Sequence, residues 1–168
     1  ATRVGIADEM GALTAATLAG DIPFEASFRK RVAMLAAVPA EVVHEEILAA
    51  PVFEQLLRLL VDHRDKVVVV TGNLDIWVRP FLERHGLRGL TSEAEVADGS
   101  ILGVRTVLDK ATAFERYPAD FTIAIGDGAN DAPMVAKAGI GIAWCGVHAA
   151  ARPVLEVADY AFAEEEAL

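Results

Sequence analysis

The sequence has little cysteine, a deficit of positive charge and no long apolar run. Its one cysteine, Cys145, excludes an intrachain disulfide and a multi-cysteine zinc cluster. No apolar run approaches the roughly 20 residues that cross a membrane, and no stretch reads as a signal peptide, so we expect a cytoplasmic protein. The 15 Lys and Arg residues against 25 Asp and Glu give a net charge of −10, which opposes binding to nucleic acid.

The sequence does contain enough apolar material for a folded core. With 168 residues, 54% of them hydrophobic, the chain can form one full core, or one core with a small appended lobe. Its negative charge disfavours anionic ligands at long range, so a bound phosphate would need local cations or Mg²⁺. The acidic tail Glu164-Glu165-Glu166 is predicted to be a solvated end.

Two carboxylates four residues apart follow a short apolar run. Residues 121–125 predict a buried strand, and Asp127 comes directly after it in the string GDGAND of residues 126–131. Asp131 lies at the start of a predicted helix. Paired carboxylates repel unless a cation lies between them, and hard oxygen ligands on a glycine-rich turn suit Mg²⁺. The alternative is a capped turn, in which Asp127 binds local amides.

Residues 1–50 predict helices with no strand between them. In one of these helices, side chains at intervals of three or four form a stripe: Phe24, Phe28, Arg31, Val32 and Leu35. A buried guanidinium needs an anionic partner, so Arg31 could contact a ligand. Alternatively, its stem packs on the helix while its head reaches water. Further helices are predicted over residues 40–48 and from Pro51 to Val61.

The run Val67-Val68-Val69-Val70 predicts a central parallel strand that is covered on both faces. Thr71-Gly72-Asn73 follows it, and a helix is predicted over residues 74–85. A hydroxyl and a glycine between a strand and a helix suit a phosphate, because the first helical amides are free and the dipole is positive there. The same three residues also read as an ordinary helix cap.

The remainder of the chain predicts a hairpin, two strands and a charged helix start. Residues 92–107 alternate polar and apolar around Asp98-Gly99, as a β-hairpin does. Lys110 opens a helix, where a lysine opposes the dipole and is either solvated or pointed at an anion. Strands are predicted over residues 139–144 and 159–162, with a short helix after Pro153.

The histidines carry no metal-binding pattern. His44 and His63 lack a second histidine or cysteine at metal spacing and are read as surface or interface residues. His148 follows a predicted strand and could border a site at the strand ends. Because no catalytic partner is visible beside it, it is read as a loop histidine.

The string GDGANDAPM, residues 126–134, closely resembles the fourth motif of the haloacid dehalogenase superfamily, in particular its phosphoserine phosphatase branch. The resemblance implies an α/β fold, with a Rossmann-like parallel sheet core and a small helical cap. It also implies that Asp127 and Asp131 bind Mg²⁺, and that Asn130 supports the phosphate or a metal-bound water.

Residues 14–35, TAATLAGDIPFEASFRKRVAML, look like the helical cap of phosphoserine phosphatases. Arg31 matches a cap arginine that binds the substrate carboxylate, and Phe24 matches a phenylalanine that lines the substrate pocket. From this resemblance we expect the cap at residues 1–50 and the α/β core at residues 51–168.

The resemblance extends to the second and third motifs of the superfamily. Thr71 stands where the phosphate-binding hydroxyl is usually a serine followed by two glycines, and here Gly72 and Asn73 follow it. Lys110 looks like the third-motif lysine, which neutralises the phosphate and the nucleophilic carboxylate. Asn73 and Trp77 depart from the phosphoserine phosphatase pattern, and their bulk should alter which leaving group fits.

Phosphatases of this superfamily begin with a strand that ends in DxDxT, whose first aspartate attacks phosphorus. No such string occurs in the 168 residues. In the family this strand lies between those that end at Thr71 and at Gly126, so a sheet without it would have two open edges. We therefore expect the strand to come from a longer polypeptide or from another chain.

Together these features predict a Mg²⁺-dependent phosphomonoester hydrolase that acts on a small phosphorylated metabolite through an aspartyl-phosphate. The alternative is a non-catalytic phosphate-binding or regulatory module that has lost the nucleophile. Phosphoryl transfer to an acceptor other than water would use the same residues. We expect no nucleic-acid or membrane partner, and the sequence does not indicate the oligomeric state.

Overall fold

The computed structural model describes residues 7–19, 21–98 and 100–165. By its internal contacts the chain divides into two compact units. The first unit is Ala1–Ala50, Gly72–His85 and Thr91–Leu108, and the second is Pro51–Thr71, Gly86–Leu90 and Asp109–Leu168. One unit boundary falls between residues 50 and 51, where the sequence places the junction of cap and core. That domain assignment stays a prediction.

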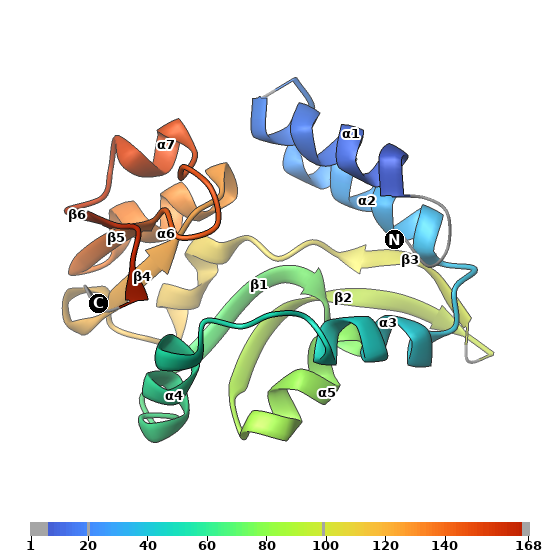
Figure 1. Ribbon diagram of the computed structural model, residues 1–168, viewed down its shortest axis with the longest axis horizontal. Helices are drawn as coiled ribbons and strands as arrows, with labels where there is room; N and C mark the ends of the chain where they lie inside the picture. Colours follow the sequence, from blue (N-terminus) through green and yellow to red (C-terminus); the bar gives the residue numbers. More distant parts are fainter. Residues whose placement is uncertain (1–6, 20, 99, 166–168) are drawn as a thin grey trace. The chain divides into compact units, whose positions relative to one another are not determined.

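The helices of the first unit are α1 (Ala7–Ala19), α2 (Phe24–Leu35), α3 (Ala40–Leu48) and α5 (Asp75–His85). α1 packs beside α2, and α3 beside α5 (Figure 1). Proline stands directly before α2 and α3, at Pro23 and Pro39, where its fixed φ suits the entry to a helix. The prediction of helices without a strand over residues 1–50 is confirmed for the described part of that range.

The core of the first unit is built by α2, α5 and the strands that follow α5. Val32 and Leu74 are completely buried, and Phe28 and Trp77 belong to the same cluster. Each buried aliphatic side chain of this size stabilises the fold by about 1.5–3 kcal/mol relative to exposure. The apolar stripe of α2 therefore faces a core, as its spacing predicts.

α5 contains a proline in its interior, Pro80. Proline has no N–H, so it cannot donate the helical hydrogen bond to the carbonyl of Ile76, four residues earlier. His44 Nε2, on α3, lies 2.8 Å from that carbonyl oxygen and donates a hydrogen bond in its place. His44 is therefore a structural link between α3 and α5.

The first sheet consists of β1 (Val68–Leu74), β2 (Arg88–Ala97) and β3 (Ser100–Thr106), in that order. β2 and β3 are antiparallel, with Ala97 opposite Ser100. Asp98, in the connection, has a φ of 50°, the left-handed conformation that a two-residue hairpin turn requires. The predicted hairpin is confirmed.

β1 continues further than the sequence predicts. Thr71-Gly72-Asn73, expected as a loop between strand and helix, lies inside β1, and α5 begins directly at Asp75. Ser92 Oγ donates a hydrogen bond to the carbonyl of Gly72 at 2.8 Å and accepts one from Leu108 N at 3.0 Å. The expected loop is wrong because this distant serine ties Gly72 to the hairpin.

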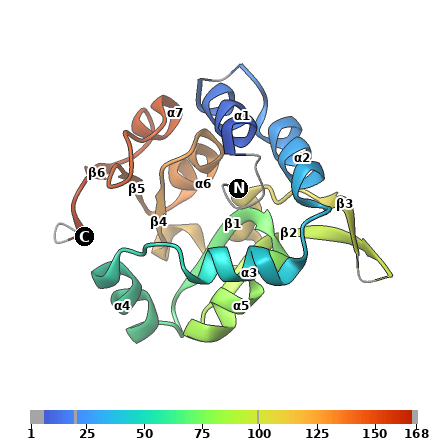
Figure 2. The same cartoon turned by 45° about the vertical axis from the view of Figure 1, so that its right-hand side comes forward.

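The second unit contains a parallel sheet of β4 (Ile123–Gly126), β5 (Ile140–Trp144) and β6 (Tyr160–Phe162). The helices and 3₁₀ turns of this unit are α4 (Glu54–Asp62), η2 (Lys110–Glu115), η3 (Ala119–Phe121), η4 (Ala129–Asp131), α6 (Ala132–Lys137) and α7 (Arg152–Leu155). α6 packs against β4 and β5 and next to α7 (Figure 2). None of the helices in the described ranges has the length and apolar character needed to cross a bilayer.

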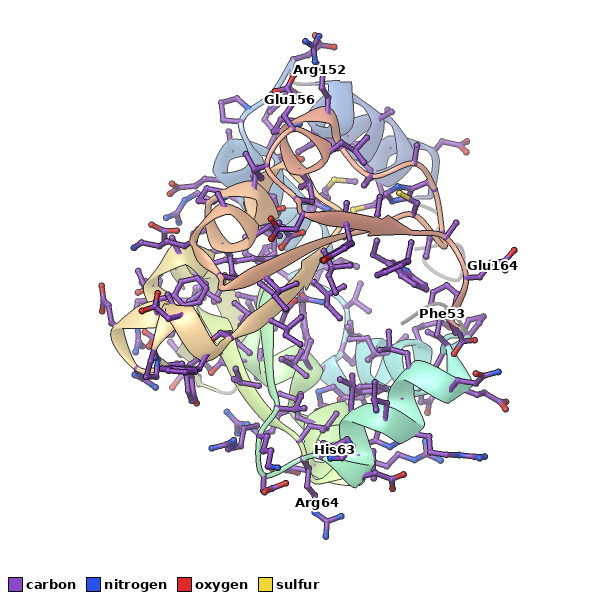
Figure 3. The ribbon with its side chains drawn as sticks, turned by 90° about the vertical axis from the view of Figure 1, so that its left-hand side faces the viewer. Phe53, His63, Arg64, Arg152, Glu156 and Glu164 are labelled. Carbon is purple, nitrogen blue, oxygen red and sulfur yellow. The ribbon has the colours of Figure 1, made fainter. Side chains whose placement is uncertain are left out.

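Two contacts fasten the start of α4 to segments that come late in the chain. Phe53, labelled in Figure 3, lies directly before α4. Its ring packs edge-on against that of Trp144 of β5, with ring centroids 5.0 Å apart. Glu165 Oε2 accepts hydrogen bonds from Gln55 N at 2.7 Å and Leu56 N at 2.9 Å. The prediction of a solvated acidic tail is therefore wrong for Glu165, whose charge satisfies the free amides at a helix start.

β1 and β4 are each the outer strand of their sheet within the described residues. The strand orders are β1-β2-β3 and β4-β5-β6, so each of these two strands has one neighbour. The residues of β1 from Val68 to Thr71 are only half-buried. Both strands that the family resemblance places beside the DxDxT strand therefore have an open edge.

Candidate active site

Asp131 is a buried carboxylate, with 4% of its surface exposed. β4 ends at Gly126, and the η4 turn brings Asp131 back against the start of the loop. Its Oδ2 accepts hydrogen bonds from Gly128 N at 2.9 Å and Asp127 N at 3.2 Å, and its Oδ1 lies 2.5 Å from Lys110 Nζ. Both oxygens of Asp131 thus bind groups of the protein.

Lys110 is mostly withdrawn from solvent, since only 12% of its side chain is exposed. The carboxylate of Asp109 accepts a hydrogen bond from Ala111 N at 3.0 Å and fixes the start of η2. η2 packs against α6 and η4, which carries the lysine to Asp131. An ammonium that is withdrawn from water needs an anionic partner. The sequence did not identify this partner, and the structure shows that it is Asp131.

The side chains of Asp131 and Asn130 pack so closely on the loop backbone that residues 126 and 128 must be glycine. A Cβ on Gly126 would lie 2.4 Å from Asp131 Cβ, and one on Gly128 would lie 2.7 Å from Asn130 Oδ1. Neither distance is possible between real atoms, so any side chain would displace Asp131 or Asn130. The two glycines thus let the carboxylate and the amide approach the backbone.

Asp127 is the more accessible carboxylate of the loop, with 44% of its side chain exposed. Its Oδ2 lies 3.3 Å from His148 Nε2, and its carbonyl accepts a hydrogen bond from Ala151 N at 2.8 Å. His148 Nδ1 lies 2.9 Å from the carbonyl oxygen of Ala149, so Nδ1 is the nitrogen that donates there. The loop after β5 therefore holds Asp127 through its backbone and its side chain.

The sequence raises His148 as a residue that could border the site, but predicts a loop histidine because no catalytic partner is visible beside it. The signal was present: β4 and β5 are parallel neighbours, and the carboxyl ends of parallel strands meet at one edge of a sheet. Asp127 and His148 each follow one of these strands. Their contact could have been anticipated from that rule.

Thr71, Gly72 and Asn73 lie at the far end of β1. Thr71 belongs to the second unit, as do Lys110 and Asp127, whereas Gly72 and Asn73 belong to the first. Asn73 Oδ1 accepts a hydrogen bond from Leu74 N at 2.9 Å. Their role as a phosphate-binding segment stays a prediction.

Arg31 and Phe24 lie in the first unit, on α2. Phe24 and Phe28 are stacked, with centroids 5.6 Å apart, and the guanidinium of Arg31 lies 5.9 Å and 6.0 Å from the two ring centroids. Its Nε is buried and has no hydrogen-bond partner among the described residues, and burial lowers the pKa of the guanidinium. Trp77, 4% exposed, likewise has a buried Nε1 without a partner in the described ranges. These donors are suited to accepting groups of a ligand.

The structure thus brings Lys110, Asp127, Asn130 and Asp131 together within the second unit, and adds His148. In the residues described, no three or more acidic, histidine or cysteine side chains converge on a single metal position. Mg²⁺ commonly keeps several waters and binds one or two carboxylates together with a substrate phosphate. The accessible carboxylate of Asp127 on a glycine-rich loop fits such an ion.

Comparison with known proteins defines the family. A family model described as haloacid dehalogenase-like hydrolase matches residues 4–136. The chain therefore belongs to the haloacid dehalogenase-like hydrolase family. This confirms the predicted superfamily and its class of enzyme, a phosphatase-type hydrolase, and the structural neighbours confirm the α/β fold class.

Curated relatives of the chain are named phosphoserine phosphatases. The chain is 32% identical to that of Methanocaldococcus jannaschii, over 93% of the chain and 79% of the relative. It is 35% identical to that of Streptomyces coelicolor and 34% to phosphoserine phosphatase SerB2 of Mycobacterium tuberculosis, covering 86% and 95% of this chain. It spans only 39% and 42% of the length of these two relatives.

Solved structures of similar proteins have the same fold. A structure titled as a phospho-aspartyl intermediate analogue of phosphoserine phosphatase is 31% identical, with a TM-score of 0.74 over 95% of this chain and 82% of the other. A haloacid dehalogenase family hydrolase of Salmonella enterica serovar Typhi is 26% identical, with a TM-score of 0.79 over 96% of this chain and 60% of the other.

Proposed function

We propose that this chain forms part of a Mg²⁺-dependent phosphomonoester hydrolase, similar to phosphoserine phosphatase, that acts on a small phosphorylated metabolite. The observation that carries the proposal is the buried ion pair of Lys110 and Asp131 beside the more accessible carboxylate of Asp127. A buried pair in that place has little value for stability by itself, because desolvation offsets much of the attraction. It is suited to fixing charge where a phosphate is bound.

Each residue of the site has a distinct proposed role. Asp127 binds Mg²⁺, which would screen the charge of the phosphoryl group when bound, and Asp131 completes the metal site and holds the loop. Lys110 offsets the negative charge of the phosphate and of the attacking carboxylate. The remaining proposed contacts to the phosphate are those of Thr71, Gly72, Asn73 and Asn130.

The proposed attack is made by an aspartate outside the 168 residues, which would form an aspartyl-phosphate that water then hydrolyses. Two observations support this. β1 and β4 each have an open edge, and a strand could pair with them there. The related structure of a phospho-aspartyl intermediate analogue of phosphoserine phosphatase supports this type of chemistry for that protein.

The proposed substrate carries a second anionic group besides its phosphate. The partly buried guanidinium of Arg31 has an Nε without a partner among the described residues, and a carboxylate would satisfy it. Phe24, stacked on Phe28, would line the apolar part of that pocket. Phosphoserine has such a carboxylate, and the relatives named for it make it the first substrate to test.

The test uses the full-length polypeptide that contains this chain, assayed with p-nitrophenyl phosphate and phosphoserine with and without Mg²⁺. We expect turnover that requires Mg²⁺ and falls at least about 100-fold in Asp127→Asn, in line with the loss of a central electrostatic group. Glu156→Gln, which alters an exposed pair with Arg152 on α7 (Figure 3), is the control and should keep full activity. Undiminished turnover in Asp127→Asn would refute the metal assignment.

A further inference from the structure

His148 and Asp127 offer two ligand atoms to one point. His148 Nε2 and Asp127 Oδ2 are 3.3 Å apart, and both side chains are less than half exposed, at 43% and 44%. Metal–nitrogen and metal–oxygen bonds of about 2.0–2.2 Å to a shared cation would span this separation at an angle of about 100°. That angle lies between octahedral and tetrahedral geometry, so the separation of the two atoms suits a shared cation.

The second nitrogen of His148 is arranged as it is in metal-binding histidines. Nδ1 donates its hydrogen to the carbonyl of Ala149 at 2.9 Å, which leaves Nε2, the nitrogen 3.3 Å from Asp127 Oδ2, as the ring atom that a cation would bind in place of a proton. Histidines that bind metals nearly always donate their other ring N–H to a carbonyl or a carboxylate, which fixes the orientation of the ring.

The loop that carries His148 is held at both ends. Cys145 N donates a hydrogen bond to the carbonyl of Phe162 at 2.7 Å, and Ala151 N donates one to the carbonyl of Asp127 at 2.8 Å. Ala150, which precedes Ala151, is buried. A Cβ on Gly146 would lie 2.3 Å from the ring of Trp144, so the turn into the loop follows that ring closely. The imidazole is thus presented by a fixed segment of backbone.

We propose that His148 is a ligand of the cation that Asp127 holds, and that it shifts the preference of this site from Mg²⁺ toward a first-row transition metal. Imidazole nitrogen is a poor ligand for Mg²⁺ and a good one for metals later in the row, such as Co²⁺. With Asp131 as the other protein ligand proposed above, coordination positions remain for water and phosphate oxygen. This inference rests on the proposed role of Asp127 as a metal ligand.

The test measures binding of the metals alone, without substrate, by isothermal titration calorimetry on the full-length protein. We expect His148→Ala to weaken Co²⁺ binding about tenfold or more and to change Mg²⁺ binding less than about twofold. His63→Ala, an exposed histidine at the end of α4 (Figure 3), is the matched control and should bind both metals as the parent does. Circular dichroism checks that each variant is folded.

Two other outcomes overturn the inference. If His148→Ala binds both metals equally or more tightly, the histidine is only an ion-pair partner that competes for Asp127. If both affinities fall by the same factor, His148 orients the carboxylate and does not bind the metal. Asp127→Asn separates this inference from the proposed function: when it leaves both affinities unchanged, the metal assignment of Asp127 fails as well.

Discussion

The ammonium of Lys110 lies 2.5 Å from Oδ1 of Asp131, while the other oxygen of the same carboxylate accepts hydrogen bonds from two backbone amides. One buried carboxylate therefore connects the start of η2 to the loop after β4. The position of Asp127 depends on this connection, because its own amide is one of the two donors.

Removal of the Lys110 ammonium should lower the free energy of unfolding. Lys110→Met leaves Asp131 buried without its cation, and breaking a buried pair in this way typically destabilises by about 3–5 kcal/mol. The double variant Lys110→Met with Asp131→Asn removes both charges and keeps an oxygen for the amides, so it should recover part of that loss. Urea unfolding measures both. Equal stability of the single variant and the parent would show that the pair has no structural role.

Gly126→Ala should destabilise the protein by about 1–3 kcal/mol, the usual cost of forcing atoms into a packed site. The new Cβ would lie 2.4 Å from Asp131 Cβ, and the carboxylate would have to leave its amides. Gly103→Ala is the control, since its Cβ would meet nothing closer than 4.0 Å. Thermal unfolding of the two variants compares them directly, and a similar loss in both would contradict the packing argument.

His44 and Pro80 should show energetic coupling. His44→Ala leaves the carbonyl of Ile76 without the donor it has now, at an expected cost of about 1–3 kcal/mol. Pro80→Ala restores a backbone N–H in the helix, so His44→Ala should cost less in that background. A double-mutant cycle by chemical denaturation measures the coupling. Additive effects would mean that the histidine does not substitute for the helical bond.

Arg31 should discriminate between substrates by their carboxylate. Under the proposed function, Arg31→Met should lower kcat/KM for phosphoserine by about 10–100-fold, the range for a lost hydrogen bond to a charged group. It should leave kcat/KM for p-nitrophenyl phosphate, which has no carboxylate, nearly unchanged. Steady-state assays on the two substrates give the ratio. Equal losses on both would place Arg31 outside the substrate pocket or make it purely structural.

The sequence predicts much of the fold because its signals are local. The apolar run at residues 121–125, the turn at Asp98-Gly99 and the stripe on α2 each depend on neighbouring residues, and the structure has β4, a hairpin and a core-facing helix there. The expected buried strand is wrong at its start, because Phe121 belongs to η3 and is 93% exposed. The family motif likewise indicates which acids belong to the site.

The features that the sequence does not predict depend on contacts between residues that are far apart in the sequence. Pro80 signals a helix carbonyl without its usual donor, but nothing marks His44, 32 residues away from Ile76, as the replacement. Gly72 reads as a loop residue until Ser92, 20 residues later, binds its carbonyl. The contact of Asp127 with His148 follows once β4 and β5 are taken as parallel neighbours, but no local signal marks the two residues as partners.

The hydrogen bonds from α4 to Glu165 have a consequence for the order in which the chain can fold. The bond from Gln55 N to Glu165 joins residues 110 positions apart. During synthesis, the start of α4 therefore leaves the ribosome long before the side chain that caps it has been made. Closing so long a loop costs conformational entropy, so this cap should form late and should open first when the protein begins to unfold. A tag joined directly after residue 165 would therefore disturb the cap of α4, although α4 lies near the other end of the second unit in the sequence.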